Sequence, residues 1–171
     1  MKKNLKKVIS AVVAFALTAS SAAFAAAPSF SDVADTASYA EAVNTLTALG
    51  VISGYEDGTF KPDDKITRAE VSTMIVAAIN RTADAQGQMG NTKFADMNNE
   101  AKKWASGYVN VAVSENIIAG FEDGTFKPDE QVTYVQVVKM LVCAAGYGQY
   151  AEYLGGWPNG YLSVASDKGV T

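Results

Sequence analysis

The sequence predicts a mainly α-helical protein built from tandem helix–loop–helix repeats, the third of which is truncated. A nine-residue segment, YEDGTFKPD at 55–63, returns as FEDGTFKPD at 121–129, with eight of nine positions identical at a spacing of 66 residues. Apolar residues follow each copy at helical intervals, and a segment near the end repeats the start of the second copy. Each unit of this kind needs a neighbour to bury its apolar face.

Residues 1–25 are expected to form a cleavable signal peptide. Four lysines precede the apolar run 8–17, and Ala23-Phe24-Ala25 has the small-x-small pattern of a cleavage site. The run is shorter than the roughly 20 apolar residues that a bilayer-spanning helix needs. We therefore expect export, cleavage near Ala25 and no membrane insertion afterwards.

The repeat spacing divides the rest of the chain into four parts. These are repeat one at 28–81, a polar linker at 82–92, repeat two at 93–146 and the start of a truncated repeat three at 147–171. We expect the chain to be a fragment, or to end early, because it stops where the third loop would follow.

The capping and turn residues of repeat one predict where its helices begin and end. A first helix is expected at about 36–49, with Gly50 as its C-cap glycine. Asp57-Gly58 is a turn dipeptide that favours a minimal hairpin. Thr67 followed by Glu70 forms the pattern of a capping box and predicts the start of the second helix.

Repeats two and three repeat this order. A helix is expected at about 100–115, with Trp104 on its inward face. Thr133 and Gln136 form a weaker capping box for the helix that follows. In repeat three, Pro158 suits the first turn of a helix.

Composition excludes several classes of function. Beyond residue 25 the chain has 10 basic and 18 acidic residues, a net charge of −8, which argues against nucleic-acid binding. There is no histidine and one cysteine, Cys143, so serine–histidine and cysteine–histidine catalysis and an internal disulfide are excluded within this chain. The acidic loop 56–60 lacks the alternating oxygen ligands of a calcium loop. We expect no catalytic residue, metal or cofactor.

The motifs resemble the S-layer homology domain family. Repeat one carries FSDV at 30–33 and GVISGYEDGTFKPDDKITRAE at 50–70, and repeat two carries FADM at 94–97, Trp104 and the segment 117–129. The resemblance implies a pseudo-threefold helical assembly whose inter-repeat grooves bind secondary cell-wall polysaccharide, often through a pyruvylated amino sugar. It also implies a secreted, noncatalytic anchor at the cell wall or S-layer surface.

The resemblance further implies a set of binding residues. Arg68 is implied to contact the acidic substituent, because a guanidinium matches a small carboxylate. The aspartates are implied to bind sugar hydroxyls or order the groove, the tryptophans to pack on a sugar face, and the glycines to let the backbone approach the ligand. The set is Arg68, Asp32, Asp96, Trp104, Trp157, Gly50 and Gly54.

Each of these residues also has a structural alternative. Arg68 can be a surface residue paired with nearby acids, the aspartates can be caps, the tryptophans can be core, and the glycines can serve backbone geometry alone. Repeat two departs from the family pattern, since Tyr134 and Gln136 stand where arginine and glutamate are favoured. This departure predicts a weak or altered groove in repeat two.

Two other functions stay open. The repeats can drive self-assembly into a surface lattice, or they can tether an enzyme domain that lies beyond Thr171. Neither alternative has a motif of its own in the sequence. The expected partners are wall polysaccharide and, in the first alternative, further copies of the chain.

Overall fold

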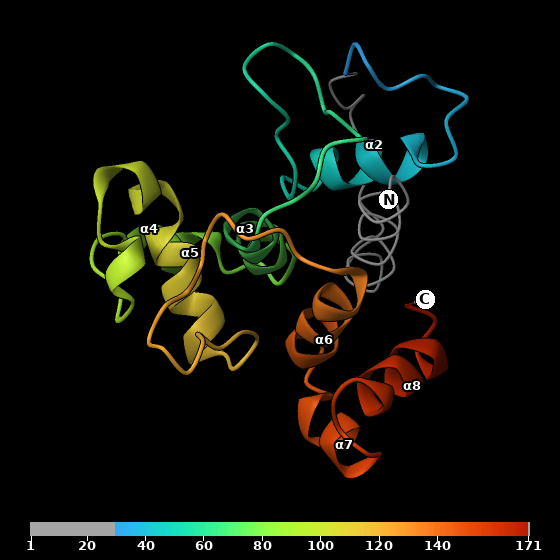
Figure 1. Cartoon of the computed structure of the whole chain (residues 1–171). Coiled ribbons are helices and arrows are strands. Elements are labelled where there is room, and N and C mark those ends of the chain that lie inside the picture. Colours follow the sequence, from blue (N-terminus) through green and yellow to red (C-terminus); the bar gives the residue numbers. More distant parts are fainter. Residues whose placement is uncertain (1–29, 171) are drawn as a thin grey trace.

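The computed structural model describes residues 30–170, so the signal-peptide prediction for residues 1–25 lies outside the described range. Within 30–170 the chain is helical and contains no β-strand, which confirms the mainly α prediction (Figure 1). One isolated antiparallel bridge joins Thr67 to Gln131. The helices are α2 (Ala40–Ala48), α3 (Arg68–Ala78), α4 (Thr82–Gly87), α5 (Lys103–Ser114), α6 (Tyr134–Ala144), α7 (Gly148–Tyr153) and α8 (Asn159–Asp167), with 3-10 turns at Ala95–Met97 and Glu100–Lys102.

The helices pack in two modules that cross the repeat boundaries. In module one, α3 and α4 pack against α5, and in module two, α6 packs against α7 and α8 (Figure 1). A contact between α3 and α6 joins the modules. The second helix of one repeat therefore packs with the first helix of the next repeat, as expected for units that cannot bury their apolar faces alone.

The segment 82–92, interpreted from its composition as a linker, contains α4. The side chain of Ala85 is fully buried against α5. Gly107 of α5 lies so near that a Cβ there would stand 1.8 Å from the carbonyl oxygen of Ala85. Gly160 of α8 approaches Ala151 of α7 in the same way, with a corresponding distance of 2.0 Å. Small residues where α4 meets α5 and where α7 meets α8 thus let each short helix pack closely on its neighbour.

The predicted starts of the second helices are confirmed. The hydroxyl of Thr67 accepts a hydrogen bond from the amide of Glu70, whose carboxylate accepts one from the Thr67 amide in return. Thr133 and Gln136 form the same capping box at α6. These bonds satisfy amides that the first turn of a helix leaves without intrahelical partners.

The first helix of repeat one is shorter than predicted. It begins at Ala40 rather than near residue 36, because the preceding residues form turns in which the amides of Ala37 and Ala40 bond to the carbonyls three residues earlier. Gly50 follows the C-cap Leu49 with φ +69°, which confirms its predicted role. The Asp57-Gly58 turn closes through a bond from the Tyr55 amide to the Thr59 carbonyl, without strands on either side.

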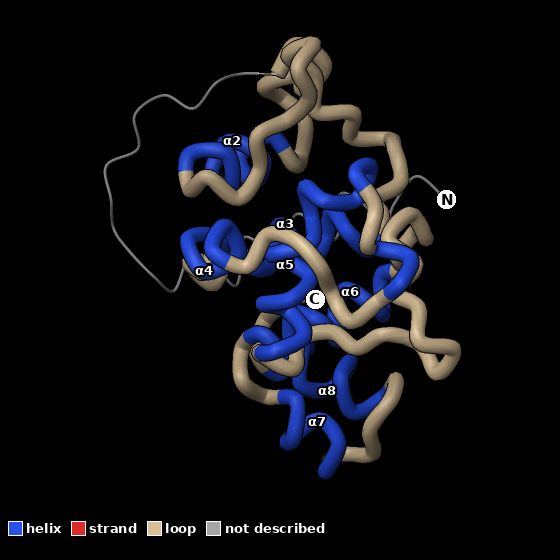
Figure 2. Tube along the Cα trace, turned by 90° about the vertical axis from the view of Figure 1, so that its left-hand side faces the viewer, coloured by secondary structure: helices blue, strands red, loops and turns tan. Residues whose placement is uncertain are grey.

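The buried residues form two clusters. The larger one joins α2, α3, α4, α5, the two loops and one face of α6, and the smaller one lies between the other face of α6 and helices α7 and α8. Figure 2 shows α2 and its loop above α3, α4 and α5, with α6, α7 and α8 below them. The pseudo-threefold packing of the repeats stays a prediction. Within residues 30–170, no helix has the length and apolar character needed to cross a bilayer.

Candidate functional site

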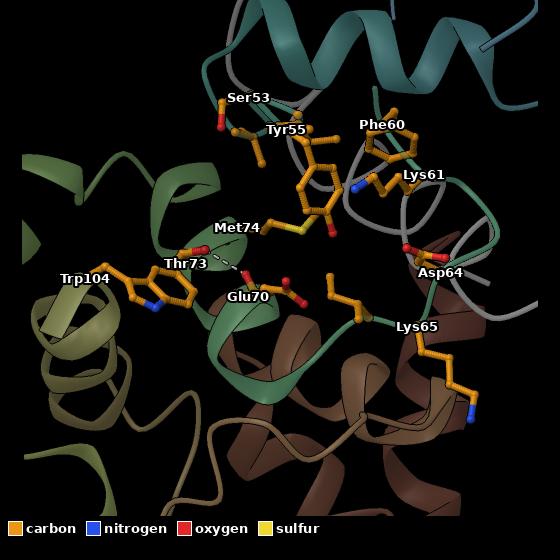
Figure 3. A pocket seen from close by; sticks show the side chains of 14 residues that line it. Ser53, Tyr55, Phe60, Lys61, Asp64, Lys65, Glu70, Thr73, Met74 and Trp104 are labelled. Atoms are coloured by element: carbon orange, nitrogen blue, oxygen red, sulfur yellow. Dashed lines mark hydrogen bonds between the residues drawn. The ribbon is translucent and has the colours of Figure 1, made fainter. Parts of the chain in front are cut away.

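Two grooves lie beside the two copies of the repeated loop. Groove one has a volume of about 280 Å³ and lies between the loop of repeat one, α3 and Trp104 of α5 (Figure 3). Groove two has a volume of about 840 Å³ and lies between the loop of repeat two, α6, Arg68 of repeat one and Trp157 of repeat three. The grooves thus occupy equivalent places, but groove two draws residues from all three repeats.

The two tryptophans lie at the grooves and not in the core. Trp104 and Trp157 are each 48% exposed. The prediction that Trp104 lies on the inward face of its helix is wrong, because the apolar stripe of α5 buries Ala105, Val109 and Ala112 instead. In Figure 3, Trp104 faces the groove from α5, across from Tyr55 and Met74.

The two aspartates of the FSDV-like motifs hold the loops. The carboxylate of Asp32 accepts hydrogen bonds of 2.8 and 2.7 Å from the amides of Phe60 and Lys61. Asp96 accepts the equivalent bonds from Phe126 and Lys127. Both lysines have φ near +55°, a conformation that residues other than glycine seldom adopt. The aspartates therefore stabilise a strained loop.

These bonds also affect the ionisation of Asp32. Burial acts to raise the pKa of its carboxyl group, but the hydrogen bonds from the Phe60 and Lys61 amides outweigh burial and hold the pKa below its ordinary value. The charged form of Asp32 is thus the form that the folded loop favours.

Gly54 lies where a side chain has no room. A Cβ on it would stand 2.1 Å from Cε1 of Phe30 and 2.8 Å from the carbonyl oxygen of Thr59, and its φ is +69°. Gly50 has the same φ, yet nothing lies within 4 Å of the corresponding position. Gly54 therefore permits the packing of Phe30 under the loop, whereas Gly50 supplies only a turn.

Arg68 joins repeat one to repeat two. Its side chain is 6% exposed, and it donates hydrogen bonds from Nε to the carbonyl of Phe126 at 2.9 Å and from Nη2 to that of Ala119 at 3.0 Å. Its guanidinium carbon lies 4.7 Å from the ring centroid of Phe121 and 4.9 Å from that of Phe126. Burial lowers the pKa of Arg68, while Glu130 and Asp96 act to raise it; an arginine stays protonated in this setting.

The backbone at the start of α3 docks on the same loop. The amides of Arg68 and Ala69 donate to the carbonyls of Glu130 and Pro128 at 2.9 and 3.0 Å. A helix start has amides without intrahelical acceptors, and here the next repeat supplies two of the acceptors. Arg68 therefore belongs to groove two and not to the loop of its own repeat. Tyr134, at the equivalent position of repeat two, does not line groove two, and the weak or altered groove predicted from it stays a prediction.

Comparison with known proteins identifies the family. The model for the S-layer homology domain matches residues 29–72 and 93–137, which is more than half of the chain.

The chain belongs to the S-layer homology domain family.

Several of its relatives are named as surface or cell-wall proteins, and one is an endoglucanase of a Bacillus species. The chain is 39% identical over 170 residues to the surface layer protein of Brevibacillus choshinensis, covering 98% of this chain and 15% of the relative. It is 39% identical over 171 residues to the middle cell wall protein of Brevibacillus brevis, covering 97% of this chain and 16% of the relative. It is 31% identical over 113 residues to the cellulosome-anchoring protein of Acetivibrio thermocellus, covering 66% of this chain and 25% of the relative. The chain thus spans about a sixth of the length of its Brevibacillus relatives.

Within this S-layer homology chain, groove two has a second cation that sequence reasoning missed. Lys139 of α6 lines the groove, with its Nζ 4.9 Å from the ring centroid of Tyr161 and 5.6 Å from that of Trp157. A signal was available, because position 139 stands 66 residues after Thr73, so the second repeat has a cation where the first has a hydroxyl.

Tyr161 and Cys143 complete the wall of groove two. The hydroxyl of Tyr161 donates to Glu152 at 2.6 Å, and burial together with this bond raises the pKa of Tyr161. Burial also raises the pKa of the Cys143 thiol. Both groups are therefore neutral at neutral pH. Within residues 30–170 no group of three or more histidine, cysteine, aspartate or glutamate side chains is placed to hold a metal ion.

Proposed function

We propose that the chain anchors an exported protein to the cell envelope by binding secondary cell-wall polysaccharide in its inter-repeat grooves, without catalysis. Membership of the S-layer homology family and the surface-protein relatives support this proposal. The observation that carries it is groove two, where Arg68, Lys139 and the half-exposed Trp157 meet at the junction of three repeats. A groove lined by two cations, one carboxylate (Glu122) and an aromatic wall has a net positive charge, which suits an acidic glycan.

The chemistry points to a sugar with a carboxylate, such as a pyruvate ketal. The chain beyond residue 25 has a net charge of −8, so an anionic ligand is attracted only where cations are gathered locally. Arg68 and Lys139 provide that charge in groove two. A charge-assisted hydrogen bond contributes roughly 1.5–3 kcal/mol, and several grooves acting together raise retention through effective concentration.

The other residues of the expected set take supporting roles in this proposal. Trp104 and Trp157 have enough exposed ring to pack on a sugar face. Asp32 and Asp96 order the loops, since their carboxylates are engaged by loop amides. Gly54 and Gly50 shape the backbone beside groove one.

Sedimentation with purified cell walls tests the proposal. The chain is mixed with untreated walls and with walls from which mild acid has removed the ketals, and the bound fraction is measured. We expect retention on untreated walls and a large loss after removal. Equal retention on both would contradict a role for the pyruvyl group, and no retention on either would contradict anchoring.

A second candidate function is self-assembly into a surface layer. The names of the Brevibacillus relatives favour it, and α7 presents Tyr150 and Tyr153 to solvent, 49% and 84% exposed. Light scattering of the protein without polysaccharide separates the two candidates. Ordered assembly in the absence of glycan would favour the lattice.

A further inference from the structure

We propose that Lys139 is the residue of groove two that discriminates acidic from neutral glycans, while Arg68 chiefly holds repeat one against repeat two. This inference rests on the proposed function and names the side chain that gives it specificity. It gives Arg68, which the family resemblance implies as the contact for the acid, a mainly structural role.

Two of the five N–H donors of Arg68, on one edge of its guanidinium, are committed to backbone carbonyls. A guanidinium binds a carboxylate best through two parallel N–H groups on one edge. In Arg68, Nε and Nη2, which form one such edge, donate to the carbonyls of Phe126 and Ala119. The side chain is 6% exposed and lies against two phenylalanine rings. Arg68 therefore contributes positive charge to the groove, but its paired edge is occupied and burial leaves its three other N–H groups little exposed to a ligand.

Lys139, in contrast, keeps its charged nitrogen available to a ligand. Its side chain is half-buried in the wall of groove two, and its Nζ lies near the rings of Trp157 and Tyr161. Among the described residues no carboxylate lies within 4.0 Å of that nitrogen. An ammonium over aromatic faces is held by a weak attraction and has three donors to offer. A sugar packed on Trp157 would place a carboxylate substituent within its reach.

Groove one has no equivalent of Lys139 beside its tryptophan. There Thr73 stands at the equivalent position, between Trp104 and Glu70 in Figure 3, and donates to the carbonyl of Glu70 at 2.7 Å. The cations of groove one are placed differently. Lys61 lies over the ring of Tyr55 and pairs with Asp57 at 3.6 Å, and Lys65 points away from the groove. Groove one thus shares the tryptophan but lacks a cation facing it.

The test uses Lys139→Thr, which gives groove two the residue of groove one. Calorimetry measures the affinity of the whole chain for the methyl glycoside of an N-acetylated amino sugar carrying a pyruvate ketal, and for its methyl ester, which is similar in shape but neutral. Protection of Cys143 from alkylation at alkaline pH reports occupancy of groove two, because Cys143 lines that groove and is the sole cysteine. Lys103→Thr, which removes an exposed lysine outside both grooves, is the control for net charge.

We expect the wild-type chain and Lys103→Thr to prefer the acid and to show protection of Cys143. Lys139→Thr should reduce the acid-to-ester preference by roughly tenfold with an unchanged thermal midpoint. Arg68→Lys keeps the charge but loses the paired donors, so it should lower the midpoint and retain the preference.

An unchanged preference in Lys139→Thr would overturn the inference and leave the proposed function standing. A loss of preference in Arg68→Lys with an unaltered midpoint would also overturn it. If the wild-type chain binds neither ligand nor purified walls, the proposed function fails and this inference fails with it.

Discussion

Groove one and groove two come from the same repeated sequence but differ in charge and in how they are assembled. Both have a loop held by an aspartate, an aromatic residue from that loop and a tryptophan from the next repeat. Groove two also receives Arg68 from the preceding repeat and has Lys139 where groove one has Thr73. The difference teaches that a motif residue need not serve the repeat in which it stands, because Arg68 acts on the following repeat.

The largest expected effect comes from Arg68→Ala, compared with Tyr134→Ala at the equivalent position of repeat two. Removing Arg68 leaves the carbonyls of Phe126 and Ala119 without their donors, so we expect a loss of about 3 kcal/mol in unfolding free energy and weaker wall binding. Denaturant unfolding and wall sedimentation measure both. A smaller loss of wall binding for Arg68→Ala than for Tyr134→Ala would contradict the assignment of Arg68 to groove two.

Gly54→Ala should have the next largest effect. The new methyl group would overlap Phe30 and the Thr59 carbonyl, and φ at this position is +69°, so we expect about 2–3 kcal/mol of destabilisation. Gly50→Ala is the matched control, since it has the same φ and open space around it and should cost about 1 kcal/mol. Equal costs in thermal unfolding would show that the Phe30 contact is unimportant.

Asp96→Asn should weaken the loop of groove two by about 1–2 kcal/mol, because an amide offers one acceptor oxygen to the two backbone amides that the carboxylate now binds. Asp32→Asn does the same at groove one with a smaller effect, since Asp32 is more exposed. Chemical unfolding measures the difference. A larger cost at Asp32 would reverse the expected order of the two loops.

The lowered pKa of Asp32 gives this loop a pH dependence. Because the folded state holds the pKa below its unfolded value of about 3.9, the stabilisation is fully present above that pH and is lost as the pH falls through the folded pKa. An acid titration followed by circular dichroism should show this loss in the wild-type chain and a shallower one in Asp32→Asn. Identical acid profiles would contradict it.

The smallest effects on stability are expected for the two tryptophans. Because each is about half exposed, Trp104→Ala and Trp157→Ala should each change unfolding free energy by less than about 1 kcal/mol. Both should weaken wall binding, Trp157→Ala more so because its groove carries the facing lysine. Binding that survives both substitutions would remove the tryptophans from the site.

The sequence was sufficient for the features that depend on local chemistry. The capping boxes at Thr67 and Thr133 and the C-cap glycine Gly50 follow from residue type and spacing alone, and all three are present. Trp104 was misplaced because a large aromatic at helical spacing fits a core position equally well, and only the neighbouring module decides which face is covered.

Features that depend on contacts between repeats were not predictable from one repeat. The two backbone partners of Arg68 lie 51 and 58 residues away in sequence, so no local pattern assigns Arg68 to groove two. Helix α4 was not predicted because its segment is polar. Only one of its residues, Ala85, is fully buried where it packs on α5. The sequence shows Lys139 as a difference between the two copies. Its place in groove two depends on Trp157, which comes from the next repeat.

The repeated unit of the sequence and the packed unit of the structure have different boundaries. A gene fragment ending at residue 81 keeps one whole repeat but separates α3 from α4 and α5, its partners in module one. A fragment ending after α5, near residue 115, cuts through repeat two yet preserves that module. Shortened versions of such proteins should therefore be cut inside the repeats, and each added repeat completes the fold of the one before it.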